Sequence, residues 1–146
     1  MVYAKLPEII DIDKAPIREL PNGRGKSVQL FNPTNGVNNV DVHINTLNPG
    51  VTVGGIHYHR YIENVYVILE GSGEIIDVAG KHTPIRAGQA VFFKPGEQKD
   101  THEIYNNGKI PLRLLEIYAP PHPKDAYVGN TLDRTKTDHV IVRDTK

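Results

Sequence analysis

Two histidines one residue apart give the sequence its clearest chemical signal. His57 and His59 stand in the segment Ile-His-Tyr-His-Arg, and Glu63 follows four residues later. Side chains on a β-strand alternate between its two faces, so both imidazoles are expected on the same side. Two adjacent imidazoles can chelate a divalent metal ion, and His102 is the candidate for a third ligand from another strand. The sequence therefore predicts a metal site built on strands.

The residues that must position these side chains have the pattern of short strands joined by turns. Residues 40–47 alternate apolar and polar, and on the run 112–118 the side chains of Leu112, Leu114, Glu116 and Tyr118 share one face. Further runs lie at 28–31, 65–69, 74–78 and 90–93, separated by turns rich in glycine, proline and asparagine. Strands at intervals of about ten residues favour an all-β sandwich or barrel.

The chain is long enough for one domain with its own core. Residues 1–25 are irregular and are expected to form an N-terminal arm. Residues 26–120 contain the strand pattern and are expected to form the barrel. Residues 121–146 form a polar tail, with an apolar patch at 140–142 that could add an edge strand.

Composition excludes several classes of function. Seventeen basic and seventeen acidic residues cancel, which argues against a nucleic-acid surface. The chain has no cysteine, so thiolate metal sites and cysteine nucleophiles are absent. No apolar run approaches the roughly 20 residues of a membrane helix, and no signal-peptide pattern opens the chain. A cytoplasmic protein without membrane contact is expected. Sequence motifs of serine hydrolases, phosphate-binding loops and zinc proteases are also missing.

With these residues the chain resembles the cupin superfamily, in which two motifs carry the metal ligands. Gly50, His57, His59, Glu63 and Gly71 match the first motif, with one extra residue after Gly50 and another after Glu63. The second motif is matched, with a lengthened loop, by Gly88, Pro95, Gly96, His102 and Asn106. The resemblance implies an all-β, double-stranded β-helix (jelly-roll) barrel holding one divalent transition metal: manganese, iron, nickel, cobalt or zinc.

The extra residue in the first motif leaves the fourth ligand open. Counting forward from His59 favours Glu63, whereas counting back from Gly71 favours Asn64. A shift of one residue reverses which side chains face the interior. An inward Glu63 implies inward Val65, whereas an inward Asn64 implies inward Tyr66. We expect Glu63 to be the ligand, because a carboxylate offsets the charge of the ion.

The resemblance is compatible with several kinds of function. Cupins include dioxygenases, decarboxylases, lyases, isomerases and cyclases, so a metal-dependent oxidoreductase or lyase acting on a small metabolite is the first hypothesis. Tyr66 and Tyr118 are the candidates for acid or base, and His43 could line the pocket. The alternative is a metal-loaded binding or accessory protein without turnover. Family members commonly pair as homodimers, which is the expected assembly. His122 and His139 are expected at loop or surface positions.

Overall fold

The computed structural model describes residues 8–129 and 131–144, which form strands joined by turns and single turns of 3-10 helix. The strands are β1 (Ile17–Leu20), β2 (Gly25–Phe31), β3 (Asp41–Leu47), β4 (Thr52–His59), β5 (Glu63–Glu70), β6 (Ser72–Ile76), β7 (His82–Arg86), β8 (Ala90–Phe93), β9 (His102–Tyr105), β10 (Leu112–Ala119), β11 (Tyr127–Val128), β12 (Thr131–Leu132) and β13 (His139–Arg143). The 3-10 helices are η1 (Ile12–Lys14), η2 (Pro21–Gly23), η3 (Pro33–Asn35), η4 (Gln98–Asp100), η5 (Lys124–Ala126) and η6 (Arg134–Lys136). Within the described residues no helix is long and apolar enough to cross a membrane.

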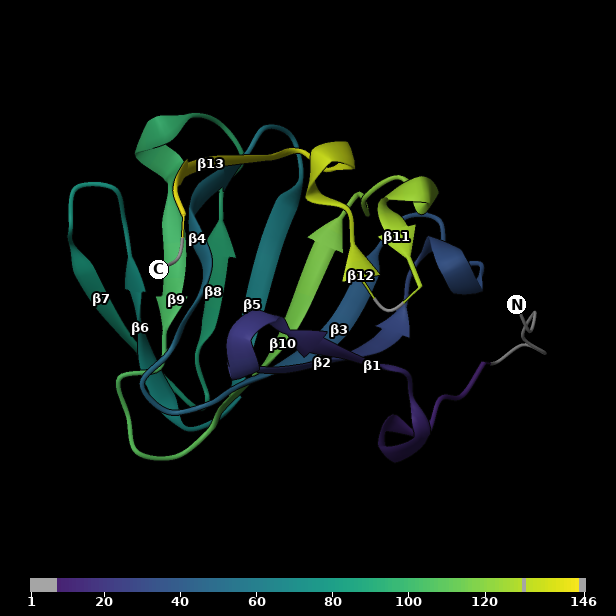
Figure 1. The fold of residues 1–146 in the computed structure, drawn as a ribbon, viewed down its shortest axis with the longest axis horizontal. Coiled ribbons are helices and arrows are strands. Elements are labelled where there is room, and N and C mark those ends of the chain that lie inside the picture. The colour runs from purple at the N-terminus through teal and green to yellow at the C-terminus, as the bar shows by residue number, and fades with distance from the viewer. Residues whose placement is uncertain (1–7, 130, 145–146) are drawn as a thin grey trace.

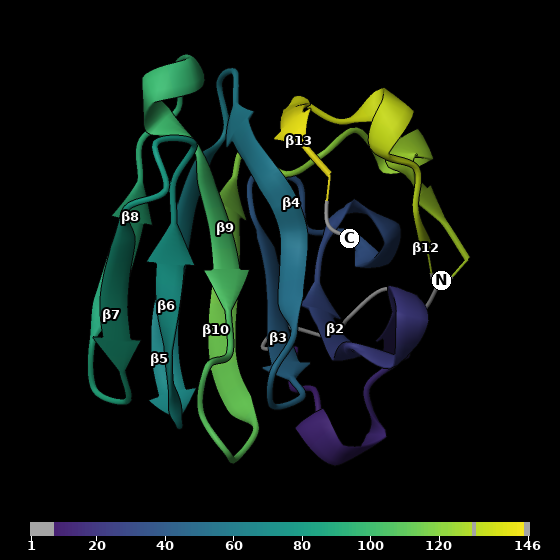
Figure 2. The ribbon, with the colours of Figure 1, turned by 60° about the vertical axis from the view of Figure 1, so that its left-hand side comes forward.

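Two antiparallel sheets form the barrel (Figure 1). One sheet has the strand order β1-β2-β3-β10-β5-β8, and the other has the order β13-β4-β9-β6-β7. Figure 2 shows the second sheet in front of the first. Neighbours in each sheet are often distant in sequence, as where β10 pairs with both β3 and β5. The prediction of an all-β jelly-roll barrel is confirmed.

The main core lies between the two sheets and follows from period-two alternation. Along β10, side chains alternate between buried and half-buried, so Leu112, Leu114, Glu116 and Tyr118 all face the interior. The apolar part of this interior is filled by Leu47, Tyr66, Ile68, Ile85, Phe93, Ile104, Leu112 and Leu114. Glu116 and Tyr118 share the inward face of β10 with Leu112 and Leu114 but lie past the apolar core. A polar site can form at that end of the interior.

A second apolar cluster lies on the outer face of the six-stranded sheet. Val28, Leu30 and Ile44 pack there with Ala15 from the N-terminal segment. Ile44 pairs with Leu115, whose side chain points away from the interior occupied by Leu114. The N-terminal segment therefore covers part of the outer face of this sheet.

One turn requires glycine for steric reasons. Gly71 connects β5 to β6 with φ of 80°, in the left-handed region. A Cβ atom placed there would lie 2.6 Å from the carbonyl oxygen of Pro111. Glycine allows β5 to turn back tightly beside the start of β10.

Candidate metal centre

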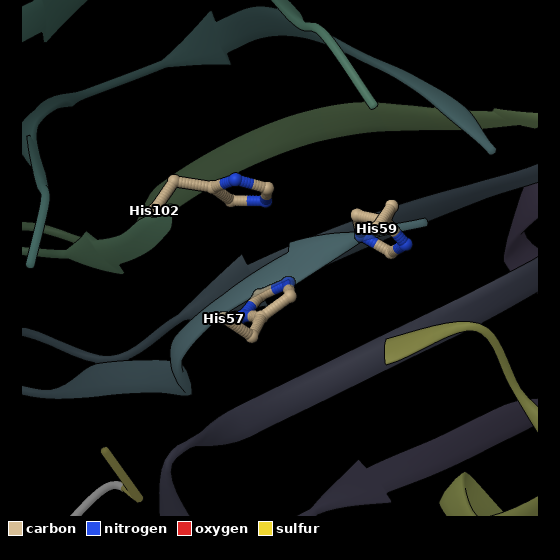
Figure 3. Close-up of side chains that lie close together, drawn as sticks. All are labelled: His57, His59 and His102. Carbon is tan, nitrogen blue, oxygen red and sulfur yellow. The ribbon is translucent and has the colours of Figure 1, made fainter. Parts of the chain in front are cut away.

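The three predicted histidine ligands lie together inside the barrel. His57 and His59 project from β4, and His102 projects from the neighbouring strand β9, where it pairs directly with His57. Figure 3 shows the three rings converging. Each histidine offers a ring nitrogen within 4.8 Å of those of the other two, and all three side chains are buried. This arrangement could hold one metal ion.

Hydrogen bonds orient two of the rings toward a common point. The Nδ1–H of His57 donates to the carbonyl oxygen of Gly55 at 2.7 Å, and the Nδ1–H of His59 donates to Oδ1 of Asp138 at 2.8 Å. Both rings then present the Nε2 lone pair. The Nε2 atoms of His59 and His102 are buried without a hydrogen-bond partner. Orphaned buried nitrogen atoms are costly, and a bound cation would satisfy them. These residues therefore fit a metal ion.

The protonation states of the histidines also suit metal binding. Burial, and then the neighbouring His59, lowers the pKa of His57 to about 4. Burial, followed by His57 and His59, places the pKa of His102 well below its usual value. At neutral pH both rings are uncharged, which is the state that coordinates metals.

The structure corrects the expectation that Glu63 faces the interior. Glu63 is exposed, whereas Asn64 is fully buried and Tyr66 and Ile68 also face inward. β5 therefore has the register in which the residue after Glu63 takes the inward position. The Asn64 amide Nδ2 donates to Oε2 of Glu116 at 3.0 Å and to the carbonyl oxygen of Ile117 at 3.2 Å. Two acceptors fix the amide orientation, and its Oδ1 is left buried without a partner.

Glu116 anchors a buried polar network that sequence reasoning did not assign to the site. Its Oε1 accepts from Nε2 of His43 at 2.8 Å and from the Asn45 amide at 2.9 Å. His43 also bonds through Nδ1 to Asp41 at 2.7 Å. Burial alone would lower the pKa of His43, but the hydrogen bonds to Asp41 and Glu116 outweigh it and raise this pKa to about 9. For Glu116 the directions are reversed: burial alone would raise its pKa, but the hydrogen bonds from His43 and Asn64 outweigh burial and lower this pKa to about 2.

A cavity of about 470 Å³ is bordered by His57 of the histidine cluster and by Asn45 and Glu116 of the network. His57, Tyr66, Glu116, Tyr118 and His139 line it. Burial, and then the Glu116 carboxylate, places the pKa of both tyrosines well above its usual value. Both phenols therefore stay protonated at neutral pH and can act as hydrogen-bond donors rather than as bases.

The C-terminal segment supplies residues that the sequence did not lead us to expect at the site. β13 pairs with β4 so that His139 lies opposite His59, and Figure 1 shows this strand beside β4. The His139 ring lies 4.4 Å from that of His59 and 5.0 Å from that of His57. His122 is buried beside Tyr118, with ring centroids 4.8 Å apart. The expectation of surface positions for His122 and His139 is wrong.

One local signal could have placed His139. It immediately precedes the apolar run 140–142 and stands two residues before Ile141, so it shares a strand face with that residue. For Asp138 no such signal exists. His59, Asp138 and His139 also have ligand atoms within 4.8 Å of one another. Because His59 gives its Nδ1–H to Asp138, we interpret this group as a hydrogen-bonded support of the first site.

Fold and site together define a small double-stranded β-helix protein with a buried three-histidine cluster. Residues 43–118 match the family model described as the cupin domain, which spans about half of the chain. The chain belongs to the cupin family.

Known proteins similar to this chain differ in their described activities. An uncharacterised protein of Methanocaldococcus jannaschii is 31% identical over 67 residues, which cover 46% of this chain and 50% of that protein. The chain thus spans about half the length of this curated relative. A predicted oxalate decarboxylase of Thermotoga maritima is 27% identical, with a TM-score of 0.64 and coverage of 77% and 98%. A polyketide cyclase of Streptomyces resistomycificus is 16% identical, with a TM-score of 0.69 and coverage of 81% and 82%, and shows the fold alone.

Proposed function

We propose that this chain is an enzyme that uses one divalent transition metal ion to act on a small polar metabolite. The observation that carries the proposal is the convergence of three buried imidazoles, two of them with orphaned Nε2 atoms, beside a cavity that His57 lines. A cavity of about 470 Å³ falls within the range typical of small-molecule sites. When bound, such an ion supplies Lewis-acid polarisation and a fixed point of attachment for a substrate oxygen.

In this proposal the fourth protein ligand is Oδ1 of Asn64. This oxygen is buried, unpartnered and fixed in direction by the two bonds of its amide nitrogen. Its neighbours on the adjacent strands are Tyr118 and Phe93. The Tyr118 ring lies 5.5 Å from that of His59, and the Phe93 ring lies 3.9 Å from that of His102. Asn64 therefore stands between two residues that contact the histidine ligands.

The remaining groups of the cavity bind and orient the substrate. The Tyr118 hydroxyl stays protonated and donates a hydrogen bond to the substrate, whereas the Tyr66 hydroxyl donates to Glu116. Glu116 is occupied by His43, Asn45, Asn64 and Tyr66, so it holds the polar wall in place and is a poor base. Arg18 and Arg134 lie among the other lining residues, together with Glu19. Mixed charges on this wall suit a polar substrate.

Elemental analysis of the purified protein tests the metal assignment. We expect close to one transition metal ion per chain in the wild type and almost none in the double variant His57→Ala, His102→Ala. The matched control is His82→Ala, because His82 is a half-exposed histidine that contacts Glu74 and does not belong to the cluster. Unchanged metal content in the double variant would refute the site.

Turnover separates an enzyme from a metal-loaded binder. Metal-loaded protein is incubated with a panel of hydroxy acids, keto acids and sugar phosphates, and products are followed by NMR spectroscopy. We expect the wild type to convert compounds of one of these classes. The His57→Ala, His102→Ala double variant should not convert them, and the Tyr66→Phe variant should convert them more slowly. Tight binding of a compound with no conversion of any would favour the binding protein instead.

A further inference from the structure

We propose that Asp138 is a positioning residue that selects the tautomer of His59 required for metal binding. The inference rests on the proposed metal site and extends it beyond the matched domain, residues 43–118, into the C-terminal segment. Asp138 is buried, just before β13 begins. Asp138 is not among the residues that line the cavity, and it acts through the histidine.

The Asp138 carboxylate is fully oriented by its partners. Oδ1 accepts the Nδ1–H of His59 at 2.8 Å. Oδ2 accepts the backbone N–H of Ile62 at 2.9 Å and that of Tyr61 at 3.2 Å. In addition, the backbone N–H of Arg60 donates to the Asp138 carbonyl oxygen at 3.3 Å. One residue thus fixes both the His59 ring and the turn that leads into β5.

This contact has a direct consequence for the proposed ligand. A neutral imidazole carries its proton on one ring nitrogen, and the partner of the other nitrogen decides which. A carboxylate at Nδ1 accepts only, so it holds the proton there and leaves Nε2 with a free lone pair. The Nε2 atom of His59 is the buried, unpartnered atom that faces the other histidines. Asp138 therefore keeps His59 ready to coordinate.

Replacing Asp138 with asparagine should reverse that choice while preserving the shape of the side chain. Asparagine has one acceptor oxygen, and the N–H groups of Tyr61 and Ile62 can only donate. The oxygen stays with these two groups, so the amide nitrogen faces Nδ1 of His59. Nδ1 must then accept, and the proton moves to Nε2, where it blocks coordination.

The experiment measures the tautomer in metal-free protein and zinc affinity in the same samples. Long-range ¹⁵N correlation NMR spectra, assigned with a His59→Gln variant, report which ring nitrogen carries the proton. We expect the Nδ1–H form in the wild type and the Nε2–H form in Asp138→Asn. Zinc affinity, measured by calorimetry with a competing chelator, should fall about 10- to 100-fold in that variant.

The matched control is Asp133→Asn, which removes the same charge from the same segment. Asp133 bonds to Thr135 and to no histidine, so zinc affinity and the His59 tautomer should be unchanged. Unchanged affinity in Asp138→Asn, or weaker binding with His59 still in the Nδ1–H form, would overturn the inference. An Nε2–H form in the wild type would overturn it without any variant. If the wild type binds no zinc or other transition metal, the proposed function fails, and the tautomer measurement still decides the role of Asp138.

Discussion

Substituting Glu116 with glutamine tests whether the buried network holds the polar wall of the cavity. Glutamine keeps the size of the side chain but offers one acceptor and one donor group. If its oxygen stays with His43 and Asn45, its amide nitrogen faces the Asn64 amide nitrogen, which also donates. A flip of Asn64 would instead put its oxygen against the carbonyl oxygen of Ile117. Neither arrangement satisfies every buried group.

The expected loss of stability follows from these two defects. His43 is protonated at neutral pH and keeps its bond to Asp41, so exchanging one charged acceptor for a neutral one costs about 1 kcal/mol. The mismatched amide pair costs about 1–3 kcal/mol, because a buried polar group loses its partner. We therefore expect Glu116→Gln to lower the free energy of unfolding by about 2–4 kcal/mol.

Urea denaturation at pH 7, followed by circular dichroism, measures the loss. The matched control is Glu70→Gln, which makes the same change at an exposed carboxylate 3.8 Å from Arg113 on the same pair of strands. A surface pair of this kind contributes about 0–1 kcal/mol, so the control should remain close to the wild type. A loss below about 1 kcal/mol for Glu116→Gln would refute the reasoning, because the network would then be dispensable.

Three further predictions concern pH and packing. The folded pKa of His43, about 9, lies above its ordinary value of 6.5, so its stabilising effect is complete below pH 6.5 and is lost as pH rises to about 9. NMR titration of its ring, and unfolding free energies that decline across this window in the wild type but not in His43→Gln, would check this. Gly71→Ala should cost more than Gly80→Ala in denaturation experiments, since both have positive φ but only the first meets a backbone carbonyl, at 2.6 Å. Leu112→Ala should cost about 2–5 kcal/mol and Ile110→Ala less than about 0.5 kcal/mol, as one side chain is fully buried and the other mostly exposed.

The strands with alternating patterns were predictable because one face of each is buried. Residues 40–47 and 112–118 correspond to β3 and β10, and the inward set on β10 is the one that the pattern indicated. In contrast, β7 (His82–Arg86) has a single buried residue, Ile85, and contains Pro84. β7 lies at the edge of a sheet and is held there by pairing with β6 rather than by a buried face. Its sequence therefore carries no alternating pattern that would predict a strand.

The register of β5 was not predictable from the first motif, because the turn before it sets that register. Counting along the chain assumes a fixed number of residues between His59 and the inward position on β5. Residues 60–62 form a turn held by Asp138, and this contact joins segments more than seventy residues apart. Local periodicity carries no information about such a contact, so Glu63 and Asn64 could not be distinguished from the sequence.

The placement of the carboxylates around the histidines has a consequence for the proposed ion. In the proposed site every protein donor is neutral: three imidazoles and the Asn64 amide oxygen. The negative charges lie one hydrogen bond further out, with Asp138 behind His59 and Glu116 behind Asn64. A neutral ligand set offsets less of the charge of a cation than a set containing Glu63 would, so an ion held by these residues would polarise a bound oxygen more strongly. Tight binding of the ion must then depend on how the neutral ligands are oriented. Asp138 holds His59 in the tautomer with a free Nε2, and Glu116 holds the Asn64 amide so that its Oδ1 stays free to coordinate.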